Sequence, residues 1–219
     1  MVMNIFKRTR VSDLTGRLPP IEIRKRARIL LIDDQPETFP LDMLRSEGYA
    51  IDHWGRVESL ERIEQGYYDI VILDIRGVAQ EISQRDGLGV LHAIKKANPS
   101  QVVVAFSGQR YSVDDMKFFK MADDVLKKPV TAVRCKMLID DLLEQQFDIR
   151  RLWRSVERSL KHNGVPERVR RKLERRVVKA AKSKQEMTYS DVLAVGLEKG
   201  DLALRVAEWI IRLLALAAA

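Results

Sequence analysis

Residues 69–75 read DIVILDI, and residues 102–108 read VVVAFSG. Both stretches are apolar runs of strand length, and each ends near a polar side chain, Asp74 in the first and Ser107 in the second. Strands that are apolar throughout are typical of parallel sheets, because helices cover both faces of such sheets. The two stretches therefore predict buried parallel strands that place polar groups at one edge of a sheet.

Similar short runs occur on either side of these stretches, at residues 29–32, 50–54 and 125–126. Segments of helical length, such as residues 40–47 and 88–97, lie between the runs. Strands and helices that alternate at this spacing predict an α/β fold with a parallel sheet wound on both faces. We count five such βα units in the sequence.

Polar side chains follow these runs at the points where the predicted strands end. Asp33 and Asp34 follow the first strand, Asp74 ends the third, Ser107 ends the fourth, and Lys128 follows the fifth. The carboxyl ends of parallel strands meet at one edge of a sheet, which is where such folds bind ligands. We therefore expect three carboxylates, a hydroxyl and an ammonium group at the same edge.

This set of groups suits phosphate chemistry with a metal ion. Clustered carboxylates favour a hard divalent cation such as Mg²⁺. Phosphoryl transfer depends mainly on positioning and on charge neutralisation, which the metal, Lys128 and Ser107 could supply to the phosphoryl oxygens. Asp74 would then be the nucleophile. Taken singly, each residue also fits a helix cap or a turn; together they predict a phosphate-accepting site.

Four segments, ILLIDDQPE, DIVILDI, VVVAFSG and DDVLKKPV, resemble in this order the signature segments of response-regulator receiver domains. The resemblance covers about residues 26–145. It implies a five-stranded flavodoxin-like fold that receives a phosphoryl group from a sensor histidine kinase or a phosphotransfer protein. It also implies that the chain is not an enzyme, beyond self-catalysed phosphorylation and dephosphorylation.

The resemblance assigns metal ligands residue by residue. Asp33 and Asp34 resemble the acidic pair at the metal, with Asp34 the more direct ligand. Asp74 and the backbone carbonyl of Arg76 would complete the protein ligands of Mg²⁺.

The resemblance also assigns the groups that handle the phosphoryl group. Asp74 would be the phosphoacceptor, Ser107 the switch hydroxyl that moves toward the phosphate, and Lys128 the lysine before a cis-proline, here Pro129.

The sequence departs from the usual receiver pattern in three places. The loop after Asp74 is about five residues longer than usual and runs through residues 77–86. Val125 stands where an aromatic side chain often takes part in the switch, so we expect the signal to leave by another route. Residues 1–25 form a basic N-terminal extension before the first strand.

Charge is distributed unevenly along the chain, whose formal net charge is +8. Residues 150–184 carry 14 Lys or Arg against three Glu, and residues 1–25 carry six against two acids, so the rest of the chain is acidic. Acidic and basic parts of this kind are expected to meet different partners.

The region 146–219 is predicted to be a smaller all-α domain. Residues 130–163 contain no Gly or Pro, which predicts one long helix that crosses the domain border. A basic helix at 167–184 follows, then a short helix capped near Thr188, and a last helix after Gly200.

Three roles stay open for this region. It could dimerise or bind a protein target, bind nucleic acid through the basic helix 167–184, or carry charges that pair only with the acidic domain. A membrane role is not expected, because the apolar end is short and interrupted by Arg212. Cys135 is the only cysteine in the sequence and is expected to be a small packed residue. Because it cannot form an internal disulfide, it favours a reducing, cytoplasmic setting.

Overall fold

The computed structural model describes residues 9–108, 116, 119–198 and 200–219. The chain divides into two compact units. The sheet unit comprises Pro19–Glu144. The helical unit comprises Met1–Leu18 and Gln145–Ala219, of which residues 1–8 lie outside the described part.

The sheet unit is built on a five-stranded parallel sheet with strand order β2-β1-β3-β4-β5. Its strands are β1 Ile29–Ile32, β2 Ile51–Trp54, β3 Ile70–Asp74, β4 Val102–Ser107 and β5 Asp124–Lys127. β1, β3 and β4 are buried at every position, which is why their sequences read as continuous apolar runs. The predicted five-stranded parallel fold is confirmed.

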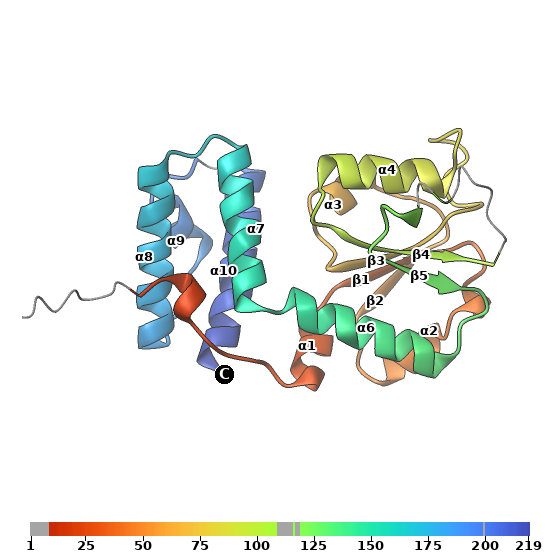
Figure 1. Cartoon of the computed structure of the whole chain (residues 1–219), viewed down its shortest axis with the longest axis horizontal. Helices are drawn as coiled ribbons and strands as arrows, with labels where there is room; N and C mark the ends of the chain where they lie inside the picture. The colour runs from red at the N-terminus through yellow and green to blue at the C-terminus, as the bar shows by residue number, and fades with distance from the viewer. Residues whose placement is uncertain (1–8, 109–115, 117–118, 199) are drawn as a thin grey trace, which may run out of the picture. The chain divides into compact units, whose positions relative to one another are not determined.

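Helices cover both faces of this sheet (Figure 1). α3 and α4 lie on one face, and α2 and α6 lie on the other. The helices of this unit are α1 Pro20–Arg26, α2 Leu41–Ser46, α3 Leu60–Glu64, α4 Gly87–Ala97 and α6 Ala132–Gln146, which ends just past its border. A 3-10 turn, η2 Pro36–Thr38, follows the end of β1.

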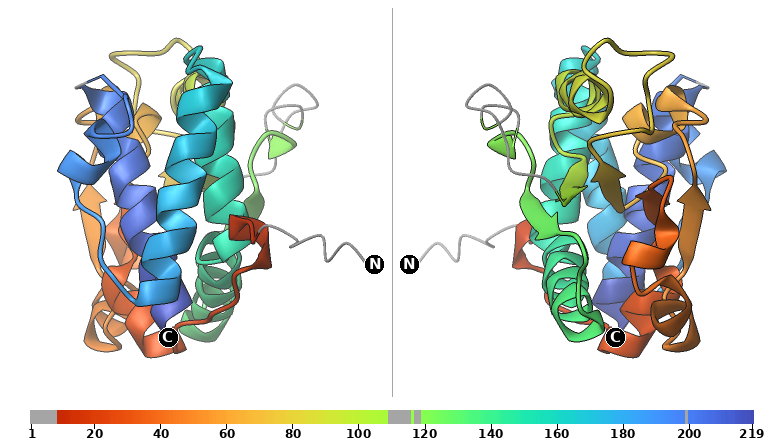
Figure 2. Two further views of the ribbon diagram at one scale, coloured as in Figure 1. Left: turned by 90° about the vertical axis from the view of Figure 1, so that its left-hand side faces the viewer. Right: turned by 90° about the vertical axis from the view of Figure 1, so that its right-hand side faces the viewer.

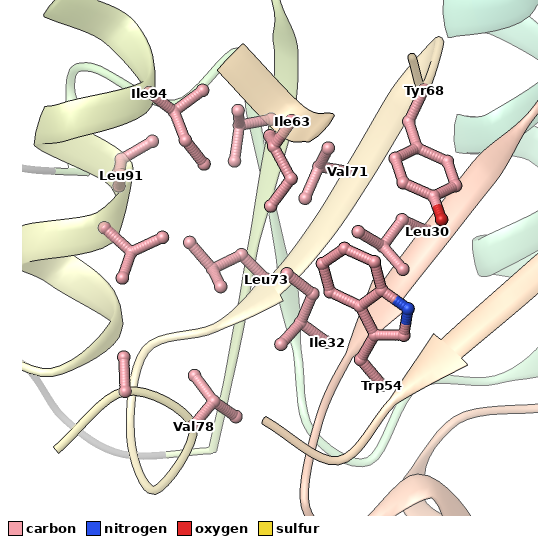
Figure 3. Close-up of a cluster of buried hydrophobic side chains, with 13 residues drawn as sticks. Leu30, Ile32, Trp54, Ile63, Tyr68, Val71, Leu73, Val78, Leu91 and Ile94 are labelled. Carbon is pink, nitrogen blue, oxygen red and sulfur yellow. The ribbon is translucent and has the colours of Figure 1, made fainter. Parts of the chain in front are cut away.

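The core under α3 and α4 explains how the strand edge is held in place (Figure 3). Alternate residues of a strand point to the same face, and every second residue of β1 and β3 contributes to this cluster. Its fully buried members include Leu30, Ile32, Val71, Leu73, Ile63, Leu91 and Ile94. The same strands therefore fix the positions of the polar residues at their carboxyl ends.

The helical unit consists of η1 Val11–Asp13, α7 Ile149–His162, α8 Glu167–Ser183, α9 Tyr189–Leu193 and α10 Asp201–Ala218. α7 and α10 pack against each other, and their buried apolar residues include Val156, Leu160, Val206 and Ile210. Figure 2 shows α8 on the side of this unit that faces the viewer in the left panel. Thr188 caps α9 as expected, with a capping box to Asp191.

The predicted continuous helix over residues 130–163 is wrong. α6 ends at Gln146 and α7 begins at Ile149. Asp148 between them has an extended backbone (φ −106°, ψ 130°), and its carboxylate accepts a hydrogen bond of 2.8 Å from the Arg151 amide. An N-cap of this kind starts a new helix without any Gly or Pro.

Residues 9–25, expected as part of one N-terminal extension, are divided between the two units. Val11 of η1 is fully buried in the helical unit, where η1 contacts α7 and α8. α1 belongs to the sheet unit instead. There Arg24 makes a bidentate ion pair with Asp140 of α6, and the Tyr49 hydroxyl donates to the same carboxylate at 2.6 Å.

Within the described residues, no helix is long and apolar enough to cross a membrane.

Candidate functional site

The candidate site lies at the carboxyl edge of the sheet. Asp33 and Asp34 directly follow β1, Asp74 is the last residue of β3, Ser107 is the last of β4, and Lys128 directly follows β5. The parallel register pairs Leu73 with Ile32 and Ser107 with Lys127, so these strand ends are level with one another. The structure thus brings the sequence-predicted residues to one edge.

The three carboxylates form one cluster. Ligand oxygens of Asp33, Asp34 and Asp74 all lie within 4.8 Å of one another. Asp33 and Asp74 are buried, with exposed fractions of 0% and 5%, whereas Asp34 is exposed. Asp34 is therefore the member of the cluster that presents its carboxylate to solvent.

Lys128 joins the two buried members of the cluster. Its Nζ donates to Asp33 Oδ1 at 2.6 Å and to Asp74 Oδ2 at 2.7 Å. The ammonium also lies 4.8 Å from the centroid of the Phe106 ring, within range of a cation–π contact. The Lys128–Pro129 peptide bond is cis, as the resemblance implied.

Burial and charge shift the ionisation of these groups in known directions. Burial raises the pKa of Asp74; the hydrogen bonds from Lys128 and the Arg76 amide oppose this rise, and the negative charge of Asp33 adds to it. Burial alone would lower the pKa of Lys128, but its hydrogen bonds to Asp33 and Asp74 outweigh burial and raise it. Three carboxylates facing one ammonium leave negative charge to be balanced, and oxygen donors suit a hard cation. The residues present therefore fit Mg²⁺.

Asp33 is held by contacts that the sequence did not reveal. Its Oδ1 accepts a hydrogen bond from the Gln35 amide at 3.0 Å, and the Thr38 hydroxyl lies 3.4 Å from Oδ2. Both donors come from the turn between β1 and α2. An acid two to five residues before small polar donors is a common turn pattern, so the sequence signal for these contacts is weak.

Ser107 is 2% exposed. Its backbone carbonyl accepts a hydrogen bond of 2.9 Å from the Lys128 amide, which fastens the end of β4 to the residue that carries the ammonium. The predicted switch hydroxyl therefore belongs to the residue that also anchors Lys128.

Solved structures similar to this chain include receiver domains. The receiver domain of NtrX from Brucella abortus is 30% identical, with 53% of this chain and 98% of that domain covered and a TM-score of 0.44. The signal receiver domain of a putative Luxo repressor protein from Vibrio parahaemolyticus is 25% identical, with 55% and 92% covered and a TM-score of 0.45. A CheY-like receiver domain protein from Methanospirillum hungatei is 24% identical, with 55% and 95% covered and a TM-score of 0.46.

Through its sheet unit, this chain belongs to the response-regulator receiver family. The strand order and the four signature segments agree with this assignment. No protein-family model matches the sequence, and no curated protein does. The remaining C-terminal part is helical.

The long loop after the predicted phosphoacceptor of this receiver is held by Asp86. The Asp86 carboxylate accepts hydrogen bonds from the Gly77 amide at 2.5 Å and the Ala79 amide at 2.7 Å. Asp86 is 9% exposed and stands at the N-cap position of α4 with a positive φ of 53°; its carboxylate binds the loop amides and makes no hydrogen bond to the helix start. Sequence reasoning identified the loop but missed this clamp, because the partners are separated by an irregular segment.

The clamped segment runs directly past the acidic cluster. The Arg76 amide donates to Asp74 Oδ1 at 3.1 Å. Gly77 has φ 83°, and a Cβ at this position would lie 2.7 Å from Asp34 Oδ2. Glycine is therefore required where the loop passes Asp34. The same clamp fixes the stretch that carries the Arg76 carbonyl, the predicted fourth metal ligand.

Val125 lies on β5 and is 38% exposed. It is two residues before Lys127, the last residue of the strand. No ring is present at this position, so the hydroxyl-and-ring switch expected of many receivers has no partner residue here.

Proposed function

We propose that this chain is a two-component response regulator that accepts a phosphoryl group on Asp74 from a sensor histidine kinase or a phosphotransfer protein. The observation that carries the proposal is the cluster of three carboxylates with Lys128 bonded to Asp33 and Asp74. Identity with the NtrX receiver domain supports the same reading.

The transfer would proceed by substitution at phosphorus. The donor is a phosphorylated histidine of the kinase or phosphotransfer protein. An oxygen of the Asp74 carboxylate forms the new O–P bond as the bond between phosphorus and the histidine nitrogen breaks. The departing histidine imidazole keeps the electron pair and takes a proton. Lys128 can leave Asp74 for a phosphoryl oxygen, and Ser107 ends β4 at the same edge. These groups stabilise charge as it develops and hold the reactants in line.

Asp33, Asp34, Asp74 and the Arg76 carbonyl would hold Mg²⁺. Bound Mg²⁺ would supply positive charge against the phosphoryl oxygens and the acidic cluster. Apart from this self-catalysed chemistry, the chain is proposed to have no enzymatic activity.

The proposal is tested by labelling with a small phosphodonor. With Mg²⁺ and acetyl phosphate, the wild-type chain is expected to gain one phosphoryl group, detected by intact-protein mass spectrometry and lost in mild base. Asp74→Asn should abolish labelling, because an amide oxygen is a poor nucleophile. Asp42→Asn, which changes an exposed acid of α2, is the matched control and should label fully. Equal labelling of Asp74→Asn and wild type would show that Asp74 is not the acceptor.

The helical unit is proposed to be the output part of the regulator. Two kinds of partner are proposed for residues 146–219: a protein, including a second copy of this chain, and nucleic acid through the basic helix 167–184. A related solved structure is described as a beryllofluoride-activated NtrC4 receiver domain dimer. Sedimentation of this chain with and without beryllofluoride would show whether activation changes its self-association.

A further inference from the structure

The orientation of α8 within the helical unit is fixed by its buried apolar residues. Leu173, Val177, Val178 and Ala180 are buried, and α8 contacts α10 and η1. Two arginines are engaged within the unit: Arg170 donates to the Val165 carbonyl, and Arg176 donates to Asp191. A third, Arg171, pairs with Glu167, and the other five cations of this helix are exposed and form an outward set.

The outward set forms a row that we call the basic row: Arg168, Lys172, Arg175, Lys179 and Lys182. All its members are exposed. Their spacing alternates between four and three residues, so at 3.6 residues per turn they lie within an arc of about 80°. At 1.5 Å per residue the row is about 21 Å long, with roughly one cation per helical turn.

The basic row lines two hollows that are open to solvent. One is formed by Glu167, Arg168, Arg171, Lys172 and Arg175, and the other by Thr9, Arg175, Val178, Lys179, Lys182 and Ser183. Arg175 belongs to both, so the hollows follow one another along α8. Glu167 also lines the first hollow, but it forms an ion pair with Arg171, which is not a member of the row.

The charges of the basic row are not neutralised within the described part of the helical unit. Lys172 donates to the Ala194 carbonyl and Lys182 to the Thr9 hydroxyl, and both acceptors are uncharged. Among the described residues, no acid forms an ion pair with a member of the row. Five cations held at regular intervals without acidic partners favour binding of an external polyanion.

We propose that the basic row binds the phosphate backbone of duplex DNA without regard to base sequence. A duplex carries regularly spaced phosphates along its length. A straight row of cations therefore matches a duplex better than it matches a compact acidic patch on a protein. α8 contains no aromatic residue on which the bases of a single strand could stack. Its exposed arc also lacks the large apolar side chains that insert into a membrane surface. This inference deepens the proposed function by naming the output partner.

The test is a fluorescence-anisotropy titration of the full-length chain against a labelled duplex of about 20 base pairs and mixed sequence. With five phosphate contacts, a plot of log Kd against log salt should have a slope of about 4.5, because each contact adds about 0.9. Between about 50 and 200 mM salt, affinity should therefore fall roughly 500-fold. Absence of binding at the lower salt concentration would overturn the proposal.

Substitutions in the row should lower this slope by a defined amount. The triple variant Arg175→Gln, Lys179→Gln and Lys182→Gln leaves two contacts and a slope of about 1.8. The double variant Arg168→Gln and Lys172→Gln leaves three contacts and a slope of about 2.7. Both variants change exposed side chains, and unchanged circular dichroism would show that they are folded.

A charge-matched control separates the basic row from net charge. Arg150, Arg154 and Arg158 are exposed on α7, and their replacement by Gln removes the same charge as the triple α8 variant. The slope should stay at about 4.5. If this control loses as much slope as the α8 variant, binding reflects overall charge and the proposal fails.

Two further measurements separate duplex binding from membrane binding, and the DNA inference from the phosphoacceptor proposal. Co-flotation with phosphatidylserine vesicles, without duplex binding, would assign the row to a membrane surface and overturn the proposal. Titrations are run without Mg²⁺ or phosphodonor, and Asp74 labelling is measured separately on each variant. If the wild-type chain is labelled on Asp74 but does not bind the duplex, the DNA inference alone fails. If it binds the duplex but is not labelled, the phosphoacceptor proposal alone fails.

Discussion

At the residue scale, Asp34 differs from its two acidic neighbours. Asp33 and Asp74 both bond to Lys128, whereas Asp34 is exposed at the edge of the cluster. Its position after a strand could be predicted from sequence, as could those of Asp33, Asp74, Ser107 and Lys128, because strand ends converge in any parallel sheet. Thr38 and Asp86 could not, because they reach the site from irregular segments whose paths have no sequence period.

Asp34→Ala should weaken Mg²⁺ binding and Asp74 phosphorylation together, because it removes a hard oxygen ligand. We expect Mg²⁺ affinity to fall by about tenfold or more, since even changes behind a metal ligand cost this much. The metal-free fold should become more stable, because repulsion among the carboxylates is relieved. Calorimetric Mg²⁺ titration and urea unfolding measure the two effects. An unchanged Mg²⁺ affinity would argue against a metal role for the cluster.

Asp86→Ala should loosen the segment that passes Asp34. The change removes the acceptor for the Gly77 and Ala79 amides, and an unsatisfied buried amide costs about 1–3 kcal/mol. We expect weaker Mg²⁺ binding with Asp33, Asp34 and Asp74 all intact. Asp86→Asn keeps one acceptor oxygen and should give an intermediate affinity.

Glu81→Ala is the control for this experiment, because Glu81 lies on the same loop but is exposed and pairs only at the surface with Arg56. Its Mg²⁺ affinity should match wild type. A normal affinity in Asp86→Ala would show that the loop keeps its path without the clamp.

At the scale of elements, the strands were predictable and the border between α6 and α7 was not. β1, β3 and β4 are buried on both faces, and burial of that kind leaves a continuous apolar record in the sequence. The helix border leaves only Asp148, which is followed three residues later by Arg151 and not by the Glu or Gln of a capping box. The apolar stripe continues through the border, because Phe147 and Ile149 are buried.

The break between α6 and α7 changes how a signal could leave the receiver. A single rigid rod from Lys128 to Leu160 is absent, since Asp148 interrupts it. Ile149 and Val156 of α7 are 3% and 0% exposed. Charged substitutions there would disrupt the packing of the helical unit, so they cannot report on coupling alone. The clamped loop at 77–86 is the better candidate, because it touches the acidic cluster directly.

The ion pair between Arg24 of α1 and Asp140 of α6 should make the free energy of unfolding depend on pH in the acid range. Burial alone would raise the pKa of Asp140, but hydrogen bonds from Arg24 and Tyr49 outweigh it and lower the pKa. A carboxyl group with a depressed folded-state pKa stabilises fully above its unfolded value of about 3.9, and this stabilisation is lost as pH falls through the folded pKa. Asp140→Asn should therefore lower stability at neutral pH and flatten its decline below about pH 4.

Urea unfolding across this pH range measures the effect. Asp141→Asn changes the adjacent exposed acid of α6 and should keep the wild-type pH profile. Parallel profiles for wild type and Asp140→Asn would show that this ion pair does not contribute to acid sensitivity.

At the scale of the whole molecule, the helical unit is assembled from both ends of the sequence. Residues 9–18 and 145–219 fold together, and the sheet unit is inserted between them. This arrangement was not predictable, because residues 9–18 show neither strand nor helix periodicity. Packing of this segment is close: a Cβ on Gly16 would lie 1.9 Å from the Leu216 carbonyl oxygen.

A discontinuous unit predicts that a change at residue 11 destabilises helices that begin 138 or more residues later in the sequence. Val11 is fully buried where η1 contacts α7 and α8. Val11→Ala removes about two methyl-sized groups from this contact and should cost about 2 kcal/mol. Hydrogen exchange measured by mass spectrometry should then accelerate by roughly thirtyfold in the slowest peptides of α7 and α10.

Peptides from β1 and β3 should exchange at the wild-type rate, and Asp74 should label normally, because the sheet unit has its own core. Ser12→Ala, which changes the exposed neighbour of Val11, should leave exchange unchanged throughout. Faster exchange in both units of Val11→Ala would mean that they unfold as one body, and no acceleration in α7 or α10 would mean that the N-terminal segment is not part of the helical core. The predicted pattern is confined to the helical unit because the chain builds two separate hydrophobic cores. Residues 9–18 and 145–219 build the helical core, and residues 19–144 build the sheet core.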